Sequence, residues 1–218
     1  MRIGILGGTG PAGSALGARL ASIGYDVVLG SRSRYRALEA VDNIVAEHPG
    51  YTLPITAGDN HEASLCEVVV IATPWDSAAT TASENEADLA GKVVICMANA
   101  LVRVGKEFQP LVPPRGSVAA HVSAAVPSCR LVAAMHHLPA KELGHLDHPI
   151  DSDVLICSDD PTATAVVMEI IAKIPGCRPL DAGELSNAMA IEAFTAVLLQ
   201  LNVKYKTRVA PKLTGIKG

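Results

Sequence analysis

Glycine recurs near the beginning of the chain at a spacing that suits phosphate binding. Gly8, Gly10 and Gly13 form the pattern G-x-G-x-x-G, directly after the apolar run RIGIL and at the start of a helix-like stretch. In a dinucleotide-binding turn the first glycine permits the tight turn and the second lets the backbone approach a pyrophosphate. The third allows the helix to pack closely on the strand, and the phosphates lie at the positive end of the helix. A glycine-rich turn that binds nothing is the alternative, but the succession of strand, turn, helix and second strand counts against it.

Three arginines follow the second apolar run, where a nucleotide-binding fold often carries an acid. The segment YDVVLGSRSRYR places Arg32, Arg34 and Arg36 directly after the expected strand 26–30. An Asp or Glu here would hydrogen-bond the ribose of NAD, whereas Arg accommodates the 2′-phosphate of NADP. Ser31 offers a hydroxyl, Arg32 a planar fork for bidentate phosphate binding, and Arg36 support one turn later. The segment therefore favours NADP; a solvated basic face is the alternative, and Arg34 has no role in this interpretation.

Two further segments follow apolar runs that read as strands. Thr73, Pro74 and Trp75 come after EVVVIA, and the residues HHLPA at 136–140 come after LVAAM. In an open parallel sheet the ligand binds outside the carboxyl ends of the strands, so both segments are expected to face the ligand. Pro74 fixes the turn and Trp75 can supply a flat apolar wall, although a Trp that caps the core fits the sequence equally well.

Several other chemistries lack their residues. His145, Asp147 and His148 match no strong zinc spacing, and the stretch KELGHLDHPIDSD around them reads as a polar loop, so no metal is expected. There is no G-x-S-x-G motif, and none of the four tyrosines is followed four residues later by lysine. The sequence therefore predicts neither a nucleophile nor a short-chain dehydrogenase that protonates a carbonyl with Tyr.

The elements that must position these residues alternate along the chain. Continuous apolar runs read as strands covered on both faces, and their alternation with helical stretches implies a parallel sheet. Helices are expected at about 11–23, 34–48, 76–88, 162–174 and 184–205, and the proline-rich stretch 99–129 reads as a broken connection. The predicted class is α/β: a Rossmann-like, doubly wound, mostly parallel sheet with a small C-terminal extension that ends in a long apolar helix. We expect an NADP-binding domain at 1–150 and a C-terminal part at 151–218 that completes the cleft within one compact unit.

The final helix is apolar on more than one face. Its large apolar residues are Leu185, Met189, Ile191, Phe194, Val197, Leu198 and Leu201. Such a helix usually packs both against its own domain and against a partner chain, so a homodimer is expected, with a merely buried helix as the alternative.

Composition limits the partners and the location. The net charge of −4 over 218 residues argues against nucleic acid as a partner, and no run approaches the roughly 18 apolar residues of a membrane span. Five cysteines, Cys66, Cys96, Cys129, Cys157 and Cys177, include no C-x-x-C pair and are expected to be reduced thiols, most of them small core residues. The expected location is cytoplasmic.

With these pieces together, the chain resembles the F420-dependent NADP oxidoreductases. The segments that carry the resemblance are GGTGPAG, VVLGSRSRYR, ATPW, HHLPA, GCRPLDAGELSN and TGIK, in that order over nearly the whole length. The resemblance implies that NADP and the 8-hydroxy-5-deazaflavin coenzyme F420 bind in one cleft and that a hydride passes directly between them. The protein would hold the two ring faces about 3–3.5 Å apart and exclude water.

The resemblance also implies contacts for both cofactors. It places NADP on Thr9, Gly10, Pro11, Ala12, Ser31, Arg32 and Arg36, with Ala140 and Thr214 close to the cofactor pair. It places the deazaflavin against Thr73, Pro74, Trp75, His136 and Leu138. His136 is expected to hydrogen-bond the deazaflavin and to support charge on its ring, without acting as an obligatory acid or base.

Two other functions remain open at the level of sequence. One is an NADPH-dependent reductase of FMN, FAD or a small imine or carbonyl substrate, because ring-facing contacts are largely backbone and apolar. The other is a sensor without enzymatic activity that binds NADP(H) through the same glycine turn and signals through a partner.

Overall fold

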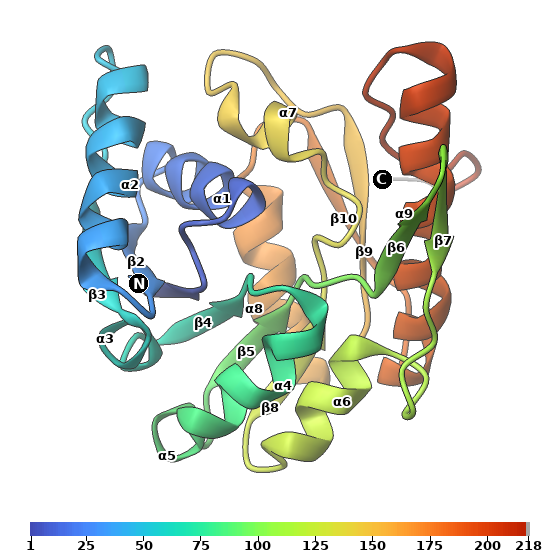
Figure 1. Cartoon of the computed structure of the whole chain (residues 1–218), viewed down its shortest axis with the longest axis horizontal. Coiled ribbons are helices and arrows are strands. Elements are labelled where there is room, and N and C mark those ends of the chain that lie inside the picture. Colours follow the sequence, from blue (N-terminus) through green and yellow to red (C-terminus); the bar gives the residue numbers. More distant parts are fainter. Residues whose placement is uncertain (217–218) are drawn as a thin grey trace.

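The fold is built on a six-stranded parallel sheet, seen in a computed structural model that describes residues 1–216 (Figure 1). The strands lie in the order β3-β2-β1-β4-β5-β8. Their bounds are β1 Arg2–Leu6, β2 Asp26–Ser31, β3 Ile55–Asp59, β4 Val68–Ile71, β5 Val93–Cys96 and β8 Arg130–Ala133. The order reverses between β1 and β4, which is where open α/β sheets bind their ligands. The predicted Rossmann-like class is confirmed.

Helices cover both faces of the sheet and form one apolar cluster on each. One cluster joins Ile5 of the sheet to residues such as Leu16 and Ile170, and the other joins Leu6 to residues such as Ala82. The helices are α1 Pro11–Ser22, α2 Arg34–Glu47, α3 Asn60–Ser64, α4 Trp75–Glu84, α5 Glu86–Leu89, α6 Val118–Ala125, α7 Ala140–Gly144, α8 Pro161–Ala172 and α9 Ala188–Tyr205, with a 3-10 turn at Leu185–Asn187. The five predicted helices are present, the third of them divided between α4 and α5.

The stretch 99–129 is better ordered than its sequence suggested. It contains an antiparallel hairpin, β6 Leu101–Val104 and β7 Glu107–Pro110, followed by α6. Gly105 makes the hairpin turn with φ +61°. The hairpin is largely exposed, so it lacks the continuous apolar run that marks a buried strand. The expected polar loop after Ala140 likewise begins with the short helix α7, and Lys217 of the segment TGIK lies outside the described residues.

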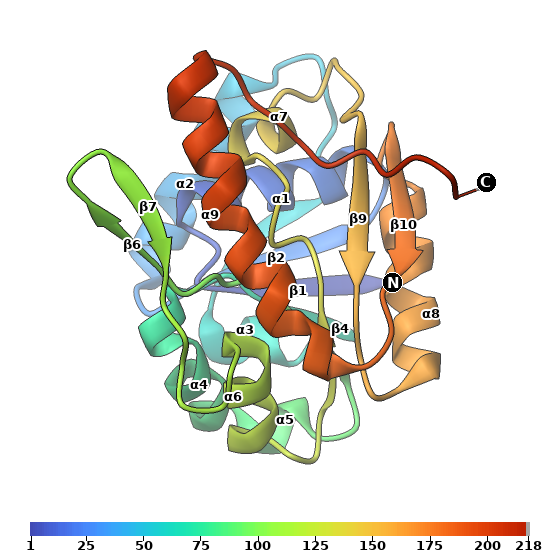
Figure 2. The same ribbon diagram turned by 90° about the vertical axis from the view of Figure 1, so that its right-hand side faces the viewer.

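The C-terminal part extends the sheet and then crosses its edge. Strands β9 Ser152–Ile156 and β10 Cys177–Asp181 pair in parallel, and an antiparallel bridge between Ala133 and Cys157 joins them to β8. Figure 2 shows α9 running diagonally between the β6–β7 hairpin and the β9–β10 pair. One apolar cluster contains residues from both sides of position 150, for example Ile3 and Val154. Within residues 1–216, no helix combines the length and apolar character needed to cross a membrane.

Helix α9 is attached to the rest of the fold by a buried carboxylate. Glu192 is 4% exposed and accepts hydrogen bonds from the backbone N–H groups of Val118 (2.8 Å) and Ala119 (3.0 Å) at the start of α6. Burial raises the pKa of this carboxyl to about 7, against the opposing effect of the two donors. The contact fixes α9 across the carboxyl edge of the sheet.

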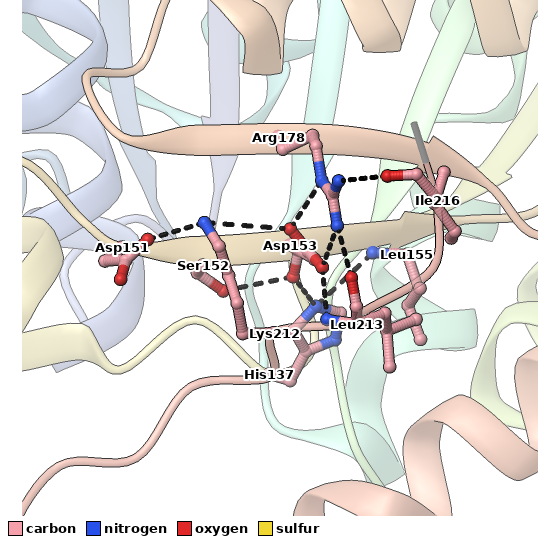
Figure 3. Close-up of polar contacts among 9 residues, drawn as sticks. All are labelled: His137, Asp151, Ser152, Asp153, Leu155, Arg178, Lys212, Leu213 and Ile216. Atoms are coloured by element: carbon pink, nitrogen blue, oxygen red, sulfur yellow. Dashed lines mark hydrogen bonds and ion pairs between the residues drawn. The ribbon is translucent and has the colours of Figure 1, made fainter. Parts of the chain in front are cut away.

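The segment after α9 is held by a second buried carboxylate, drawn in Figure 3. Asp153 is fully buried and pairs with both Nε (2.8 Å) and Nη2 (2.7 Å) of Arg178. The same guanidinium donates to the carbonyl groups of Leu213 (2.7 Å) and Ile216 (3.1 Å). The backbone N–H of Asp153 donates to the carbonyl of Pro211 at 2.8 Å. The final segment therefore lies against β9 and β10.

A buried arginine holds the loop that follows α7. Arg19 of α1 is 1% exposed, and within the described part of the chain its guanidinium donates only to backbone carbonyl groups. These belong to Glu142 (3.0 Å), Leu143 (3.0 Å), His145 (2.6 Å), Leu146 (3.3 Å) and His148 (3.2 Å). A buried cation is tolerated only where its donors are satisfied, so Arg19 and this loop require each other.

Replacing Arg19 should therefore destabilise the protein strongly. We expect Arg19→Met to lower the free energy of unfolding by about 3 kcal/mol, because it leaves several carbonyl groups without a donor. Arg19→Lys should recover little of the loss, since an ammonium has three donors in place of the planar fork. Urea unfolding measures both, with exposed Arg103→Met as the control; a loss no larger than the control's would show that the clamp contributes nothing.

Candidate functional site

The glycine turn after β1 is shaped by close backbone contacts. Gly7 has φ +70°, and its N–H donates to Oδ1 of Asn60 at 3.1 Å. The N–H of Gly8 donates to the carbonyl of Gly30 in β2 at 2.8 Å. A Cβ on Gly13 would lie 2.8 Å from Cα of Gly8, so the packing of α1 on the turn excludes any side chain there. The positive φ belongs to Gly7, one residue before the first glycine of the predicted pattern.

Gly10 differs from these glycines because no atom of the described residues crowds it. It precedes α1 as the capping residue, with ordinary backbone angles of φ −73° and ψ 161°. The nearest atom to an added Cβ is the carbonyl oxygen of Gly7, at 3.8 Å. Packing and backbone conformation therefore give no reason for a glycine here, whereas a phosphate group that approaches the backbone does.

A cavity of about 420 Å³ opens in front of the turn. The structure brings seven predicted NADP contacts to its wall: Thr9, Gly10, Pro11, Ala12, Ser31, Arg32 and Arg36. Among the described residues, the guanidinium groups of Arg32 and Arg36 have no hydrogen-bond or ion-pair partner. Gly8 and Gly13 lie behind the turn as packing residues. The cavity thus combines open backbone at a helix start with two unpaired cations.

Arg34, which had no role at the level of sequence, points away from this cavity. Its Nη1 lies 2.7 Å from both carboxylate oxygens of Glu62, on the helix that follows β3. Glu62 also accepts the N–H of Asp59 at 2.9 Å and so completes the cap of α3. The Arg34 guanidinium holds the pKa of Glu62 below its usual value. Arg34 therefore neutralises the nearby acid.

A second cavity, of about 390 Å³, lies over the carboxyl ends of β4, β5 and β8. Its wall contains the predicted deazaflavin contacts Thr73, Pro74, Trp75, His136 and Leu138, together with Ala140. Helix α9 closes it with Thr195, Leu198, Leu199 and Asn202. Trp75 is 36% exposed at the mouth, so it is a wall of this cavity rather than a cap on the core. The two cavities share Ala12, Ala72, Thr73 and Pro74 and form one cleft.

His136 is a deeply buried polar side chain in the wall of this second cavity. It is 4% exposed, and neither ring nitrogen has a hydrogen-bond partner within residues 1–216. Burial lowers its pKa to about 3, with a smaller contribution of the same sign from His137; the carbonyl groups of Met97 and Ala98 oppose the shift without forming hydrogen bonds to the ring. At pH 7 the imidazole is therefore neutral, with one donor and one acceptor free.

His137 has a structural position. Its Nε2 lies 2.9 Å from the carbonyl oxygen of Asp153 and 3.3 Å from the amide nitrogen of Leu155, both in β9 (Figure 3). Burial lowers the pKa of His137, so the ring is neutral as well. His137 thus ties the segment after β8 to the strand that also binds the C-terminal segment.

Sequence reasoning missed several residues of the cleft. Asn99 follows β5 as Thr73 follows β4, so the rule that selected Thr73 could have found it. Thr195, Asn202 and Val209 reach the second cavity from the C-terminal part, and no local pattern identifies them. Thr214 is not brought to either cavity: it follows Leu213, whose carbonyl binds Arg178, and it is exposed.

The histidines of the loop 145–148 contribute their backbone to the fold. The backbone carbonyl groups of His145 and His148 accept hydrogen bonds from Arg19. Throughout residues 1–216, no three His, Cys, Asp or Glu side chains lie close enough together to hold a metal ion.

Comparison with known proteins gives consistent results. Residues 2–100 match the family model described as "NADP oxidoreductase coenzyme F420-dependent". The F420-dependent NADP reductase of Methanocaldococcus jannaschii is 34% identical, with 100% of this chain and 97% of the relative covered. The enzyme of the same name from Methanothermobacter marburgensis is 31% identical, with 96% of each covered. The crystal structure of a candidate F420-dependent NADP reductase from Arthrobacter sp. FB24 matches the fold with a TM-score of 0.80, at 22% identity and with 94% and 95% of the two chains covered.

The two glycines should separate binding from folding. Gly10→Ala should cost at most about 1 kcal/mol of stability, because Ala caps a helix less well than Gly, yet weaken NADP⁺ binding at least about tenfold by obstructing the phosphates. Gly13→Ala should instead lose at least about 2 kcal/mol of stability, since the backbone must move apart. Calorimetric titration and urea unfolding measure the two effects; unchanged NADP⁺ affinity in Gly10→Ala would argue against phosphate binding at this turn.

Proposed function

The chain belongs to the family of F420-dependent NADP reductases, and from that premise we propose that it transfers a hydride directly and reversibly between NADP(H) and coenzyme F420. One observation carries the proposal beyond the similarity. The two cavities are contiguous, sharing Ala12 and residues 72–74, and they differ in character. One presents open backbone and cations, the other flat apolar groups and a neutral imidazole. Direct hydride transfer between two ring systems needs such a continuous cleft, because both rings must lie in it together.

The first cavity fits NADP by its donor set. The backbone at Gly10 is open to the start of α1, where the helix dipole favours an anion. Arg32 and Arg36 lack partners within the described chain, and Ser31 lies beside them. Arg34 pairs with Glu62 and so offsets the negative charge of this carboxylate, which would otherwise oppose a 2′-phosphate. We propose that Arg32, supported by Ser31 and Arg36, selects NADP over NAD.

The second cavity fits a planar, partly polar ring system. Pro74, Trp75 and Leu138 supply apolar walls. Thr73 Oγ1 and both nitrogens of His136 are buried there without a hydrogen-bond partner in residues 1–216. Unsatisfied buried polar atoms are costly, so a ligand with matching donors and acceptors would stabilise this arrangement. We propose that His136 contacts the deazaflavin as a neutral hydrogen-bonding group, since its low pKa excludes a cationic role at pH 7 in the free protein.

The chemistry supplied by the bound pair is hydride exchange between nicotinamide and deazaflavin rings, which requires no protein nucleophile. The chain's own task is to orient the rings and keep water away. Helix α9 does the second with Leu198 and Leu199 on the side of the cleft opposite the strand ends. Glu192 holds that helix in place through the N–H groups at the start of α6. A shift of α9 would open the second cavity, which we call the ring cavity, to solvent.

We also propose a homodimer that uses the outer face of α9. Leu185, Ile191 and Leu198 face the protein, while Met189, Phe194 and Val197 are 48%, 39% and 51% exposed. A row of exposed apolar residues on a helix whose other face is buried supports contact with a partner chain. The expected cytoplasmic location, the division at residue 150 and the contact at Thr214 stay predictions.

A single mixture tests the function against its two rivals. Purified protein with NADPH and oxidised F420 should remove the deazaflavin absorbance rapidly. Parallel mixtures with FMN or FAD should react at least about 100-fold more slowly, because the polar edges of their rings differ from those of the deazaflavin that the ring cavity is proposed to fit. Loss of FMN or FAD absorbance alone would select a reductase of another flavin. Tight NADP(H) binding without any turnover would select a sensor.

Cofactor selectivity is tested separately at Arg32. We expect Arg32→Ala to raise the Kd of NADPH by about 10- to 100-fold, the contribution of charge-assisted hydrogen bonds to a phosphate, and to change the Kd of NADH less than threefold. Arg34→Ala is the matched control: it removes an equal charge that does not face the cavity and should weaken NADPH by clearly less. Equal losses for both cofactors in Arg32→Ala would return this segment to a solvated basic face.

A further inference from the structure

The backbone turns in an unusual way directly before His136. Met135 has φ +65° although it carries a side chain, and it is 1% exposed. Left-handed backbone is unfavourable for residues with a Cβ and persists where the surroundings hold it. The turn begins after the N–H of Ala134 has paired with the carbonyl of Cys96, and the N–H of Leu138 closes it on the carbonyl of Met135 at 3.4 Å. This turn presents the imidazole of His136 to the ring cavity.

The side chain of Asn99 binds the backbone of this turn at His136. Its Nδ2 donates to the carbonyl oxygen of His136 at 2.8 Å. Its Oδ1 lies 3.2 Å from the hydroxyl of Thr195, which also lies 3.4 Å from the His136 carbonyl. With the amide reversed, two oxygens would face each other at 2.8 Å, so the hydrogen-bonding pattern determines its orientation. Three segments distant in sequence, after β5, after β8 and within α9, therefore meet at one carbonyl group.

We propose that Asn99 is a positioning residue: by clamping the carbonyl of His136 it maintains the left-handed turn at Met135 and so fixes the unpaired imidazole of His136 in the wall of the ring cavity. The inference rests on the proposed function, because it assigns the imidazole to the deazaflavin. The inference adds to the site a residue, Asn99, that acts through the backbone of His136 and need not touch either cofactor. Thr195 in turn orients the amide of Asn99.

The clamp has a consequence for the two cofactors. His136, Leu138 and Asn99 line the second cavity and do not line the first. Releasing the turn should therefore weaken the deazaflavin and leave NADP almost unaffected. A general loss of structure would weaken both.

The test uses Asn99→Ala and Asn99→Asp, with exposed Asn43→Ala as the control. Calorimetric titration should show the Kd of oxidised F420 raised about tenfold in both Asn99 variants and the Kd of NADP⁺ changed less than twofold. Asn99→Asp keeps an oxygen but loses the donor, so an Asp variant that binds F420 like the wild type would overturn the proposal in favour of a direct ligand contact through the oxygen. Equal weakening of F420 and NADP⁺ would overturn it in favour of a general structural role.

Combination with His136→Ala tests whether Asn99 acts through His136. In that background, Asn99→Ala should weaken F420 binding by less than about twofold, since the imidazole it positions is gone. Independent, multiplicative effects of the two substitutions would overturn the proposal.

A measurement without any cofactor separates this inference from the proposed function. Hydrogen–deuterium exchange should be faster over residues 134–139 in Asn99→Ala and unchanged over residues 7–14. If the wild type fails to bind or reduce F420, the proposed function fails, and the exchange data still decide whether the clamp exists. If the wild type binds F420 but Asn99→Ala leaves both the exchange and the F420 affinity unchanged, the clamp is wrong.

Discussion

The whole site depends on the parallel alignment of the central strands. Because all the strands of the six-stranded sheet run in the same direction, their carboxyl ends meet at one edge of the sheet. Gly10, Arg32, Thr73, Asn99 and His136 each follow a different strand and converge there. The central strands are almost fully buried between two apolar clusters, which keeps their register and hence the spacing of these residues fixed.

Buried ionisable groups complete the cleft on the sides that the sheet does not reach. Arg19 fixes the loop after α7, Glu192 fixes α9, and Asp153 with Arg178 fixes the final segment. A buried ionisable group is stable only in the geometry that satisfies its hydrogen bonds, so each of these groups permits one arrangement of the segment it holds. The second cavity therefore has a definite shape although its walls come from parts of the chain far apart in sequence.

Most of the fold could be predicted because its signals are local. Buried parallel strands appear as continuous apolar runs, and helices show their caps and periodicity, which located the sheet and five helices. The hairpin at 101–110 was missed because its exposed strands carry no such run. The glycine turn and Arg32 could be selected in advance because their signals are also local. The roles of Arg34 and Asn99 could not, since their partners, Glu62 and His136, are distant in the chain.

The sequence by itself determined the class of fold, the glycine turn after the first strand and the basic residues after the second strand, because each depends on residues within about one helical turn or strand. The tertiary structure decided the rest. It separated the arginine that faces the cavity from the one that pairs with an acid, and it left His136 neutral and unpaired while His137 became a tie to β9. These distinctions depend on burial and on partners distant in the chain. Two residues of the same type that lie close together in the sequence therefore cannot be distinguished from the sequence alone.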